Sequence, residues 1–309
     1  MSPSDLYGKT ILISPLNWGM GHVSRCIPLI KKLKDQNNCI IIACNKNQQV
    51  VFESYFNTGL VFIDHEGYPF YFKGRGNFIS DTIFNFKELK KRYKSELLQV
   101  NKLLNKFEID VVISDHRYGF RSNNCVSIFM THQLRLPVPW YFKVAQLWHK
   151  TQVLKFDFQW IVDNEDSRLA GKLSNNSKFP NSKYIGYLSR FEDLFTIKNE
   201  SNLGILLISG PPEYYPYLFD GFKNQLLSGE IDLIIGDEKA HDVYKSLNYR
   251  LKFHLSTDWK STDEIICCAK KIFGYCGYST LMDLNYLMCE SQLIACPGQL
   301  EQLYLKKKS

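Results

Sequence analysis

The sequence predicts an α/β protein built from two doubly wound domains, each with a parallel sheet covered by helices. The chain has 309 residues, a length that suits two domains of about 150 residues each. Short, almost continuously apolar segments alternate with polar segments of helical length, which is typical of parallel strands buried on both faces. The same alternation occurs in both halves of the chain, so each half is expected to form its own sheet.

The first half contains six apolar segments that predict strands. They are residues 10–14, 39–44, 60–63, 110–114, 125–130 and 157–162. The longer segments between them predict helices at 22–34, 46–56, 86–106 and 140–151. The polar stretch 174–183 predicts a surface loop, and the charged run 87–96 predicts the solvated face of a long helix.

The second half repeats the same scheme without repeating the sequence. Strands are expected at 203–209, 231–235, 250–254, 271–274 and 292–296, with helices between them. Charges, polar residues and a turn over 187–202 predict a linker. The expected domains are therefore 1–186 and 203–309, and the second is expected to be shortened at its C-terminal end.

The composition favours an anionic partner. Lys and Arg outnumber Asp and Glu by 38 to 31, which leaves a net charge of +7. The basic residues are scattered, so nucleic acid is not expected as a partner. Nine cysteines without CxxC spacing favour a reducing cytosol. We expect a cytoplasmic protein, with any membrane contact peripheral and at the inner face, because no apolar run approaches ~18 residues.

The segment 273–304 is the most informative part of the chain. The strand 271–274 ends in a turn at Gly277, and Ser279 and Thr280 then begin a helix. The strand 292–296 breaks at Pro297 and Gly298, after which Gln299, Glu301 and Gln302 open another helix. Helix N-termini present backbone N–H groups and a positive dipole, which suit a diphosphate. The nearby carboxylates and amides suit sugar hydroxyl groups, so we interpret this segment as a nucleotide-sugar site.

The loop NWGMGHVSR, residues 17–25, follows the first strand. Gly19 and Gly21 permit a tight turn, and His22 and Ser24 stand in the first helical turn. His22 is either a capping residue or a general base that takes a proton from an acceptor hydroxyl. Asp115, at the end of the strand 110–114, is either its orienting carboxylate or an N-cap residue.

Other polar segments are compatible with more than one role. His116 and Arg117, next to Asp115, could serve an anionic acceptor. The segments 68–78 and 135–143 mix aromatic and basic residues, which suit sugar stacking or contact with membrane headgroups. Residues 64–66 predict a solvated loop entry or a wall of the acceptor site. The run 163–166 predicts an acidic turn, and we expect neither a metal site nor a cofactor.

With these motifs in place, the chain resembles the GT-B glycosyltransferases. It resembles bacterial proteins similar to the UDP-N-acetylglucosamine transferase that makes the peptidoglycan lipid intermediate, a family 28-like enzyme. The resemblance implies two Rossmann-like domains facing across a cleft, with the acceptor on the first and the nucleotide sugar on the second. It also implies inverting, metal-independent transfer of a hexose from a UDP-sugar to a glycan or lipid-linked acceptor of the cell envelope.

The resemblance also implies roles for individual residues. The phosphates of the donor would meet Ser209, Gly210, Gly277, Ser279 and Thr280, and Tyr278 would belong to the same donor site. Asp283 would reach the ribose, and the donor sugar would meet Gly298, Gln299, Glu301 and Gln302. Ser189 and Arg190 would approach the diphosphate from the linker. The loop that receives the acceptor or a phosphate would comprise Gly19, Gly21, Ser24 and Arg25.

Two other functions stay open at this point. A UDP-sugar epimerase on the same fold would bind the same donor, although such enzymes surround the sugar with several acidic and basic groups. A non-catalytic nucleotide-sugar-binding protein is the second alternative. It is favoured by Tyr275 and Cys276, which stand where the resemblance implies an arginine.

Overall fold

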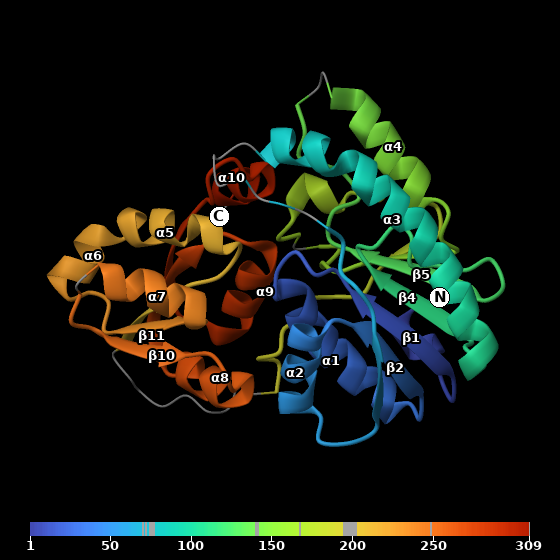
Figure 1. The fold of residues 1–309 in the computed structure, drawn as a ribbon, viewed down its shortest axis with the longest axis horizontal. Coiled ribbons are helices and arrows are strands. Elements are labelled where there is room, and N and C mark those ends of the chain that lie inside the picture. The colour runs from blue at the N-terminus through green and yellow to red at the C-terminus, as the bar shows by residue number, and fades with distance from the viewer. Residues whose placement is uncertain are drawn as a thin grey trace. The chain divides into compact units, whose positions relative to one another are not determined.

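The computed structural model describes most of the chain as two compact units. The described residues are 1–69, 71, 73, 78–139, 142–166, 168–193, 203–247 and 249–308, with the side chains of 78, 79 and 83 left aside. The first unit lies within residues 1–188, and the second consists mainly of Ser189–Ser309. Each unit holds one parallel sheet (Figure 1). The predicted α/β class and the parallel sheets are therefore confirmed.

The first unit contains a seven-stranded sheet in the order β3-β2-β1-β4-β5-β6-β7. Its strands are β1 (Thr10–Pro15), β2 (Cys39–Cys44), β3 (Leu60–Asp64), β4 (Val111–Asp115), β5 (Val126–Thr131), β6 (Phe158–Ile161) and β7 (Ser182–Tyr184). Its helices are α1 (Gly21–Asp35), α2 (Lys46–Tyr55), α3 (Phe78–Phe107) and α4 (Lys143–Val153), with short 3-10 turns at Pro3–Asp5 and Gly171–Ser174.

The second unit contains a five-stranded sheet in the order β10-β9-β8-β11-β12. Its strands are β8 (Leu203–Leu207), β9 (Leu233–Gly236), β10 (Lys252–Leu255), β11 (Ala269–Tyr275) and β12 (Glu290–Ile294). Its helices are α5 (Tyr215–Gly221), α6 (Lys223–Ser228), α7 (Glu238–Ser246), α8 (Trp259–Cys267), α9 (Tyr278–Leu287) and α10 (Leu300–Lys306), with a 3-10 turn at Pro212–Tyr214.

Apolar strand residues build both cores. Ile11, Leu12 and Ile13 of the central strand β1 are fully buried, as expected for a strand covered on both faces. The helices α2, α7 and α8 each begin at a side chain that accepts a hydrogen bond from a backbone N–H of the first turn. Asn45 accepts a hydrogen bond from the backbone of Gln48 at the start of α2. Such caps satisfy N–H groups that have no partner within the helix.

The strands agree with the prediction to within two residues at each end. Two other expectations were incomplete. The helix expected at 86–106 begins at Phe78, and the stretch 174–183 is more than a surface loop because it runs into the edge strand β7. That strand has only three residues, Ser182–Tyr184, and lacks the apolar run by which a strand is recognised. Residues 194–202 of the expected linker lie outside the described residues.

Among the helices that the structure describes, none combines the length and the apolar character that a bilayer crossing requires.

Candidate active site

The first site lies where the strand order of the first sheet reverses. The parallel strands β1 and β4 are neighbours, and their last residues, Pro15 and Asp115, lie opposite each other. The backbone N–H of Leu16 continues this pairing by donating to the Asp115 carbonyl oxygen at 3.1 Å. Ligands of doubly wound sheets bind beyond the carboxyl ends of the strands at such a reversal. The loop that follows β1 leads directly into α1, which carries His22.

His22 and Asp115 meet at this reversal point. His22 Nδ1 lies 2.9 Å from Asp115 Oδ2, and the two side chains are 18% and 0% exposed. Burial, followed by the Arg25 guanidinium, lowers the pKa of His22 below its ordinary value. Burial alone would raise the pKa of Asp115, but Arg25 and His22 outweigh it and lower that pKa. The pair therefore consists of a neutral imidazole and an ionised carboxylate at neutral pH.

Arg25 is part of the same buried cluster. Its Nε donates to Asp115 Oδ2 at 2.9 Å, its Nη2 contacts Asp115 Oδ1, and its side chain is only 1% exposed. The structure thus corrects the expectation that Arg25 faces an acceptor or a phosphate, because the guanidinium is directed into the protein. Ser24 is buried as well. Gly21 is the first residue of α1, and Gly19 has a φ of +153° in the preceding loop.

His116 and His132 lie next to the cluster, and His149 stacks against His116. His116 has a φ of +62°, which is uncommon for a residue with a side chain, and its Nδ1 lies 3.0 Å from Thr131 Oγ1. Its ring centroid is 6.1 Å from that of His22. Burial lowers the pKa of His116 well below its ordinary value, so it is a poor partner for an anion. Burial also lowers the pKa of His149 to about 4.

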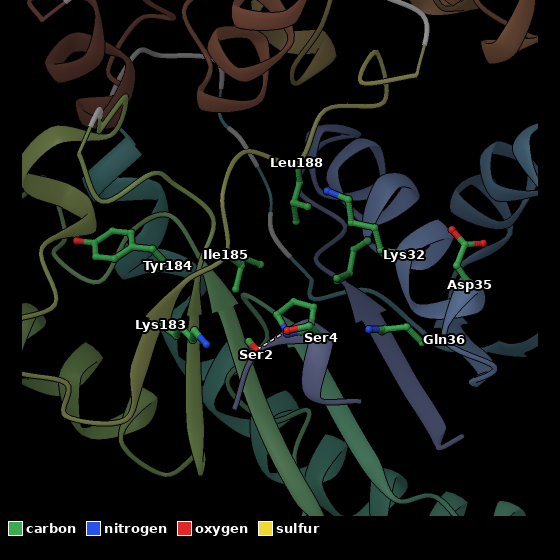
Figure 2. A pocket seen from close by; sticks show the side chains of 11 residues that line it. Ser2, Ser4, Lys32, Asp35, Gln36, Lys183, Tyr184, Ile185 and Leu188 are labelled. Atoms are coloured by element: carbon green, nitrogen blue, oxygen red, sulfur yellow. Dashed lines mark hydrogen bonds between the residues drawn. The ribbon is translucent and has the colours of Figure 1, made fainter. Parts of the chain in front are cut away.

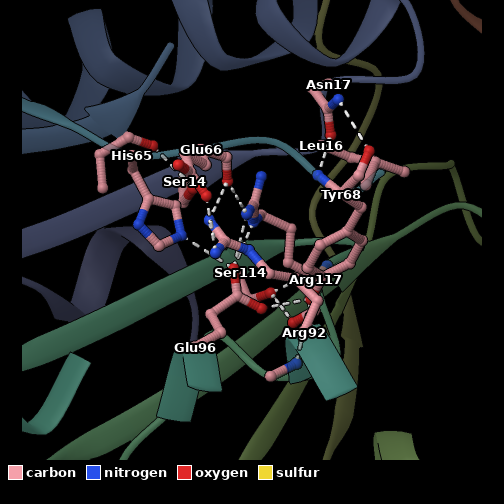
Figure 3. A network of polar contacts seen from close by, with 12 residues as sticks. Ser14, Leu16, Asn17, His65, Glu66, Tyr68, Arg92, Glu96, Ser114 and Arg117 are labelled. Atoms are coloured by element: carbon pink, nitrogen blue, oxygen red, sulfur yellow. Dashed lines mark hydrogen bonds and ion pairs between the residues drawn. The ribbon is translucent and has the colours of Figure 1, made fainter. Parts of the chain in front are cut away.

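A buried ionic network supports the loops beyond β1, β3 and β4 (Figure 3). Arg117 Nη2 lies 2.6 Å from Glu96 Oε1, and the two side chains are 1% and 0% exposed. His65 Nε2 lies 2.9 Å from the same carboxylate oxygen, and the Tyr68 hydroxyl donates to the other one. Arg117 also donates to the carbonyl oxygens of Pro15 and Glu66. One guanidinium therefore joins three loops at this edge of the sheet.

This network corrects three expectations. Arg117 is committed to Glu96 and does not face an anionic acceptor. His65 is buried rather than part of a solvated loop entry. Glu96 is fully buried although it lies in the run expected to be a solvated face, whereas the lysines of that run are exposed. The acidic run 163–166 follows β6, and the Asp163 carboxylate in it accepts hydrogen bonds from the backbone N–H groups of Leu169 and Ala170.

The second unit has an equivalent reversal between β8 and β11. Leu207 and Gly274 lie opposite each other near the carboxyl ends of these strands. Ser209 and Gly210 follow β8 and are exposed, and Gly210 has a φ of +91°. The segment from Gly277 to Thr280 follows β11 and begins α9. These predicted phosphate-binding residues therefore come from two adjacent strand ends of one sheet.

The start of α9 has the features expected of an anion-binding helix terminus. Gly277 is the N-cap residue and has no side chain to cap the first-turn N–H groups. A Cβ built on Gly277 would lie 3.7 Å from Thr280 Oγ1, so that hydroxyl lies close to the turn. Ser279 and Thr280 are half-buried, whereas Tyr278 is 2% exposed and packs inward. Ser279 Oγ donates to the Gly21 carbonyl oxygen at 3.1 Å.

Asp283 has internal partners in place of the solvent exposure expected of a ribose ligand. Ser189 Oγ donates to Asp283 Oδ1 at 2.6 Å, and Arg190 Nη1 donates to Oδ2 at 3.1 Å. Arg190 Nε also donates to Asp263 Oδ1 at 2.7 Å, and its guanidinium stacks on the rings of Phe191 and Trp259. Arg190 is therefore held between two carboxylates within the second unit.

The turn before α10 is closed by amide side chains. Gln302 Oε1 accepts a hydrogen bond from the Cys296 backbone at 2.8 Å, and Gln302 Nε2 donates to Gln299 Oε1 at 2.8 Å. Gly298 has a φ of +75°, which suits glycine, and Glu301 lies in the first turn of the helix. Gln302 thus orders this turn, whereas the family resemblance implied that it binds the donor sugar.

A separate cavity of about 520 Å³ lies elsewhere on the first unit (Figure 2). It is lined by the first residues of the chain, the C-terminal turns of α1, the strand β7 and the segment after it, including Lys32, Lys183 and Leu188. None of the predicted site residues lines it. Among the described residues, no group of three or more His, Cys, Asp and Glu side chains is arranged to hold a metal ion.

The partners of the buried charges were missed from the sequence. Asp263 and Glu96 each lie inside a helix among other polar residues, and nothing in their local pattern indicates burial. Arg25 stands three residues after His22 on α1. Residues i and i+3 of a helix lie on the same face, so this spacing was the available signal.

Comparisons with known proteins agree with this architecture. No protein-family profile and no curated protein matches the sequence. Solved structures match it over 97% of the chain. The glycotransferase of kitacinnamycin has a TM-score of 0.64 at 12% identity over 84% of its chain. The spinosyn rhamnosyltransferase SpnG has a TM-score of 0.60 at 11% identity over 84% of its chain.

A third similar structure is S. aureus MnaA with UDP, with a TM-score of 0.59, 11% identity and coverage of 97% of this chain and 87% of that chain. At such identities the similarity establishes the fold. The chain has two parallel-sheet α/β domains of seven and five strands, which is the GT-B fold.

We predict that Glu96→Gln lowers the free energy of unfolding by about 3–5 kcal/mol, because Arg117 would keep a buried charge without its anionic partner. Urea-induced unfolding followed by circular dichroism measures this change. Glu66→Gln is the matched control, since the Glu66 carboxylate is 80% exposed in its ion pair with Arg92. That variant is expected to lose at most about 1 kcal/mol. Equal effects of the two variants would contradict the assigned role of the network.

The raised pKa of Asp283 predicts how the stability of the protein varies with pH. Burial raises the pKa of this carboxyl from 3.8 to about 6, against the opposing effects of Arg190 and Ser189. Between these two values the folded protein binds more protons than the unfolded chain, so this group reduces stability as the pH rises. Relative to the wild type, Asp283→Asn should gain up to about 3 kcal/mol between pH 4 and pH 7. A stability difference that does not vary with pH over this range would contradict the prediction.

Proposed function

We propose that this protein is a glycosyltransferase that moves a sugar from a UDP-sugar donor to an acceptor hydroxyl with inversion. The observation that carries the proposal is the contact of 2.9 Å between His22 Nδ1 and Asp115 Oδ2 at the strand reversal of the first domain. A neutral imidazole beside an ionised carboxylate is the arrangement that general-base catalysis at a hydroxyl requires. The GT-B fold adds support, because its neighbours include glycosyltransferases.

In the proposed reaction, the acceptor hydroxyl attacks the anomeric carbon from the face opposite the nucleoside diphosphate. The hydroxyl proton passes to His22 Nε2, which retains a lone pair when Nδ1–H donates to Asp115. The bond between the anomeric carbon and the diphosphate oxygen breaks, and the diphosphate leaves with the electron pair. Asp115 stabilises the imidazolium that forms. A single displacement of this kind inverts the anomeric centre.

The diphosphate is assigned to the start of α9. The helix dipole, the first-turn N–H groups and the hydroxyls of Ser279 and Thr280 favour the charge that develops on the leaving group. Ser209 and Gly210 would complete the phosphate pocket from the adjacent strand end. Stabilisation by a helix terminus requires no metal ion, and the proposal assigns none. The neighbours SpnG and MnaA were solved with thymidine diphosphate and with UDP, which supports a nucleoside diphosphate as ligand.

The sugar is proposed to be a hexose, and the acceptor a glycan or lipid-linked molecule of the cell envelope. These finer assignments depend on the sequence resemblance. A neighbour solved with spinosyn aglycone shows that a protein of this fold binds an acceptor of another kind.

A donor screen with purified protein tests the function. We expect at least one UDP-sugar to raise the melting temperature and to be hydrolysed slowly or transferred. His22→Gln should then lower kcat by about 10²–10⁴-fold while the KM for the donor stays within a few-fold, because His22 acts on the acceptor. His241→Gln is a matched control from the second unit and should leave kcat unchanged. Binding without turnover would overturn catalysis, and a new epimer formed without acceptor would show an epimerase.

We also propose that the α3–α4 surface touches an anionic membrane that carries the acceptor. The two helices lie side by side (Figure 1). They are in contact, since the rings of Phe86 and Trp148 are 5.6 Å apart. Phe84 of α3 and Val144 and Leu147 of α4 are 63%, 79% and 62% exposed. Exposed lysines flank these apolar side chains: Lys87, Lys90, Lys91, Lys94 and Lys143. Apolar side chains ringed by cations suit an anionic lipid surface.

Vesicle sedimentation tests this contact. Val144→Asp/Leu147→Asp should lower binding to phosphatidylglycerol vesicles at least tenfold, because two apolar contacts become charges that the lipid repels. Leu227→Asp is the matched control, since Leu227 is 67% exposed on α6 of the second unit. Binding to neutral vesicles should be weaker, and added salt should reduce the anionic binding. Equal binding by both variants and the wild type would exclude this surface.

A further inference from the structure

We propose that Arg25 is a positioning residue that selects the tautomer of His22 and thereby controls whether His22 is able to accept a proton. The catalytic consequence rests on the proposed function, but the tautomer itself does not. The proposal begins from the contacts of one nitrogen atom. His22 Nδ1 lies 2.9 Å from Asp115 Oδ2 and 2.8 Å from Arg25 Nη2.

These two contacts exclude each other in the neutral ring. A ring nitrogen of neutral histidine carries either a proton or a lone pair. With the proton on Nδ1, His22 donates to Asp115, and Nε2 keeps the lone pair needed to take a proton. With the proton on Nε2, Nδ1 accepts from Arg25, and Nε2 is only a donor. The first tautomer is competent as a base, and the second is not.

Arg25 cannot be neutralised or easily moved. A guanidinium stays protonated in proteins, and this one is fixed by a side-on pair with Asp115. Its Nη1 also lies 3.0 Å from His132 Nδ1, and His132 is 6% exposed. Since Arg25 has no acceptor atom, His132 must present a lone pair at Nδ1. The guanidinium therefore holds two imidazoles and one carboxylate in a single buried arrangement.

The charged and titratable groups that face His22 come from four parts of the first unit. Asp115 lies at the end of β4, Arg25 lies one turn along α1, and His116 and His132 lie in the loops after β4 and β5. Asp115 favours the protonated ring, while Arg25 opposes it. The carboxylate is shared between His22 and Arg25, so it orients His22 less completely than an Asp devoted to the histidine would.

Two variants are expected to shift the tautomer in opposite directions. Arg25→Met leaves Asp115 as the charged partner of Nδ1, so the Nδ1–H form should gain at least about tenfold over the wild type. Asp115→Asn leaves Arg25 as the cationic donor, so the Nε2–H form should gain instead. Losing the guanidinium should also raise the pKa of His22, because Arg25 lowers it in the wild type.

Ring nitrogen NMR of the full-length, ¹⁵N-histidine-labelled protein measures both quantities, with His22→Gln used for assignment. Opposite tautomer shifts in the two variants support the proposal, and identical spectra overturn it. If Arg25→Met does not fold, as judged by circular dichroism, Arg25→Lys and Asp115→Asn carry the test. Lysine keeps the positive charge but lacks the several N–H groups of the guanidinium. The Nδ1–H form of His22 should therefore still increase in Arg25→Lys.

The spectra separate this proposal from the proposed function. If the tautomer shifts but no donor gives sugar transfer, the role of Arg25 is supported and the proposed glycosyltransferase activity is contradicted. Where transfer is found, the acidic limb of the kcat/KM profile of Arg25→Met should move to higher pH with the donor KM unchanged. A profile that does not move, with tautomer shifts absent, would leave Arg25 a purely structural residue and overturn the inference.

Discussion

The charge of Asp115 is the constraint on which the first domain depends. A carboxylate with no solvent exposure is strongly unfavourable unless cationic and hydrogen-bonding groups surround it. Arg25 supplies the cation and His22 a further contact, and both come from the first two turns of α1. The compensation of one buried charge thus fixes the position of α1 relative to β4. The imidazole proposed as base is placed by the same requirement.

The two domains share a topology but use it differently. In the first, the strand reversal carries charged side chains that compensate one another: Asp115, Arg25 and His22. In the second, the equivalent position carries glycines and hydroxyls, and Asp283, further along α9, is bound to Ser189 and Arg190. Side-chain charge suits proton transfer, whereas backbone N–H groups suit a diphosphate. This difference between two similar sheets supports the proposal that the acceptor binds the first domain and the donor the second.

Most of the fold could be predicted from the sequence, but only part of the candidate site could. Buried parallel strands are continuous apolar runs, so Cys39–Cys44 was located to the residue, whereas the polar edge strand Ser182–Tyr184 was missed. The meeting of His22 with Asp115 followed from strand topology, because both leave the same sheet edge. The burial of Arg25, Arg117 and Glu96 did not follow. It depends on which side chains from distant segments converge, and local periodicity does not encode that.

The buried network around Glu96 also orders the loops beside His22. Arg117 binds the carbonyl oxygens of Pro15 and Glu66 and lies two residues after Asp115. It therefore connects the end of β1, the loop after β3 and the chain beyond β4, while Tyr68 shares a reciprocal pair of hydrogen bonds with Asn17. Loops fixed by buried ionic contacts lose little further entropy when a ligand binds. The loop that leads to His22 is held by Arg117 at Pro15 and by Tyr68 at Asn17, so contacts within the first domain pre-organise it.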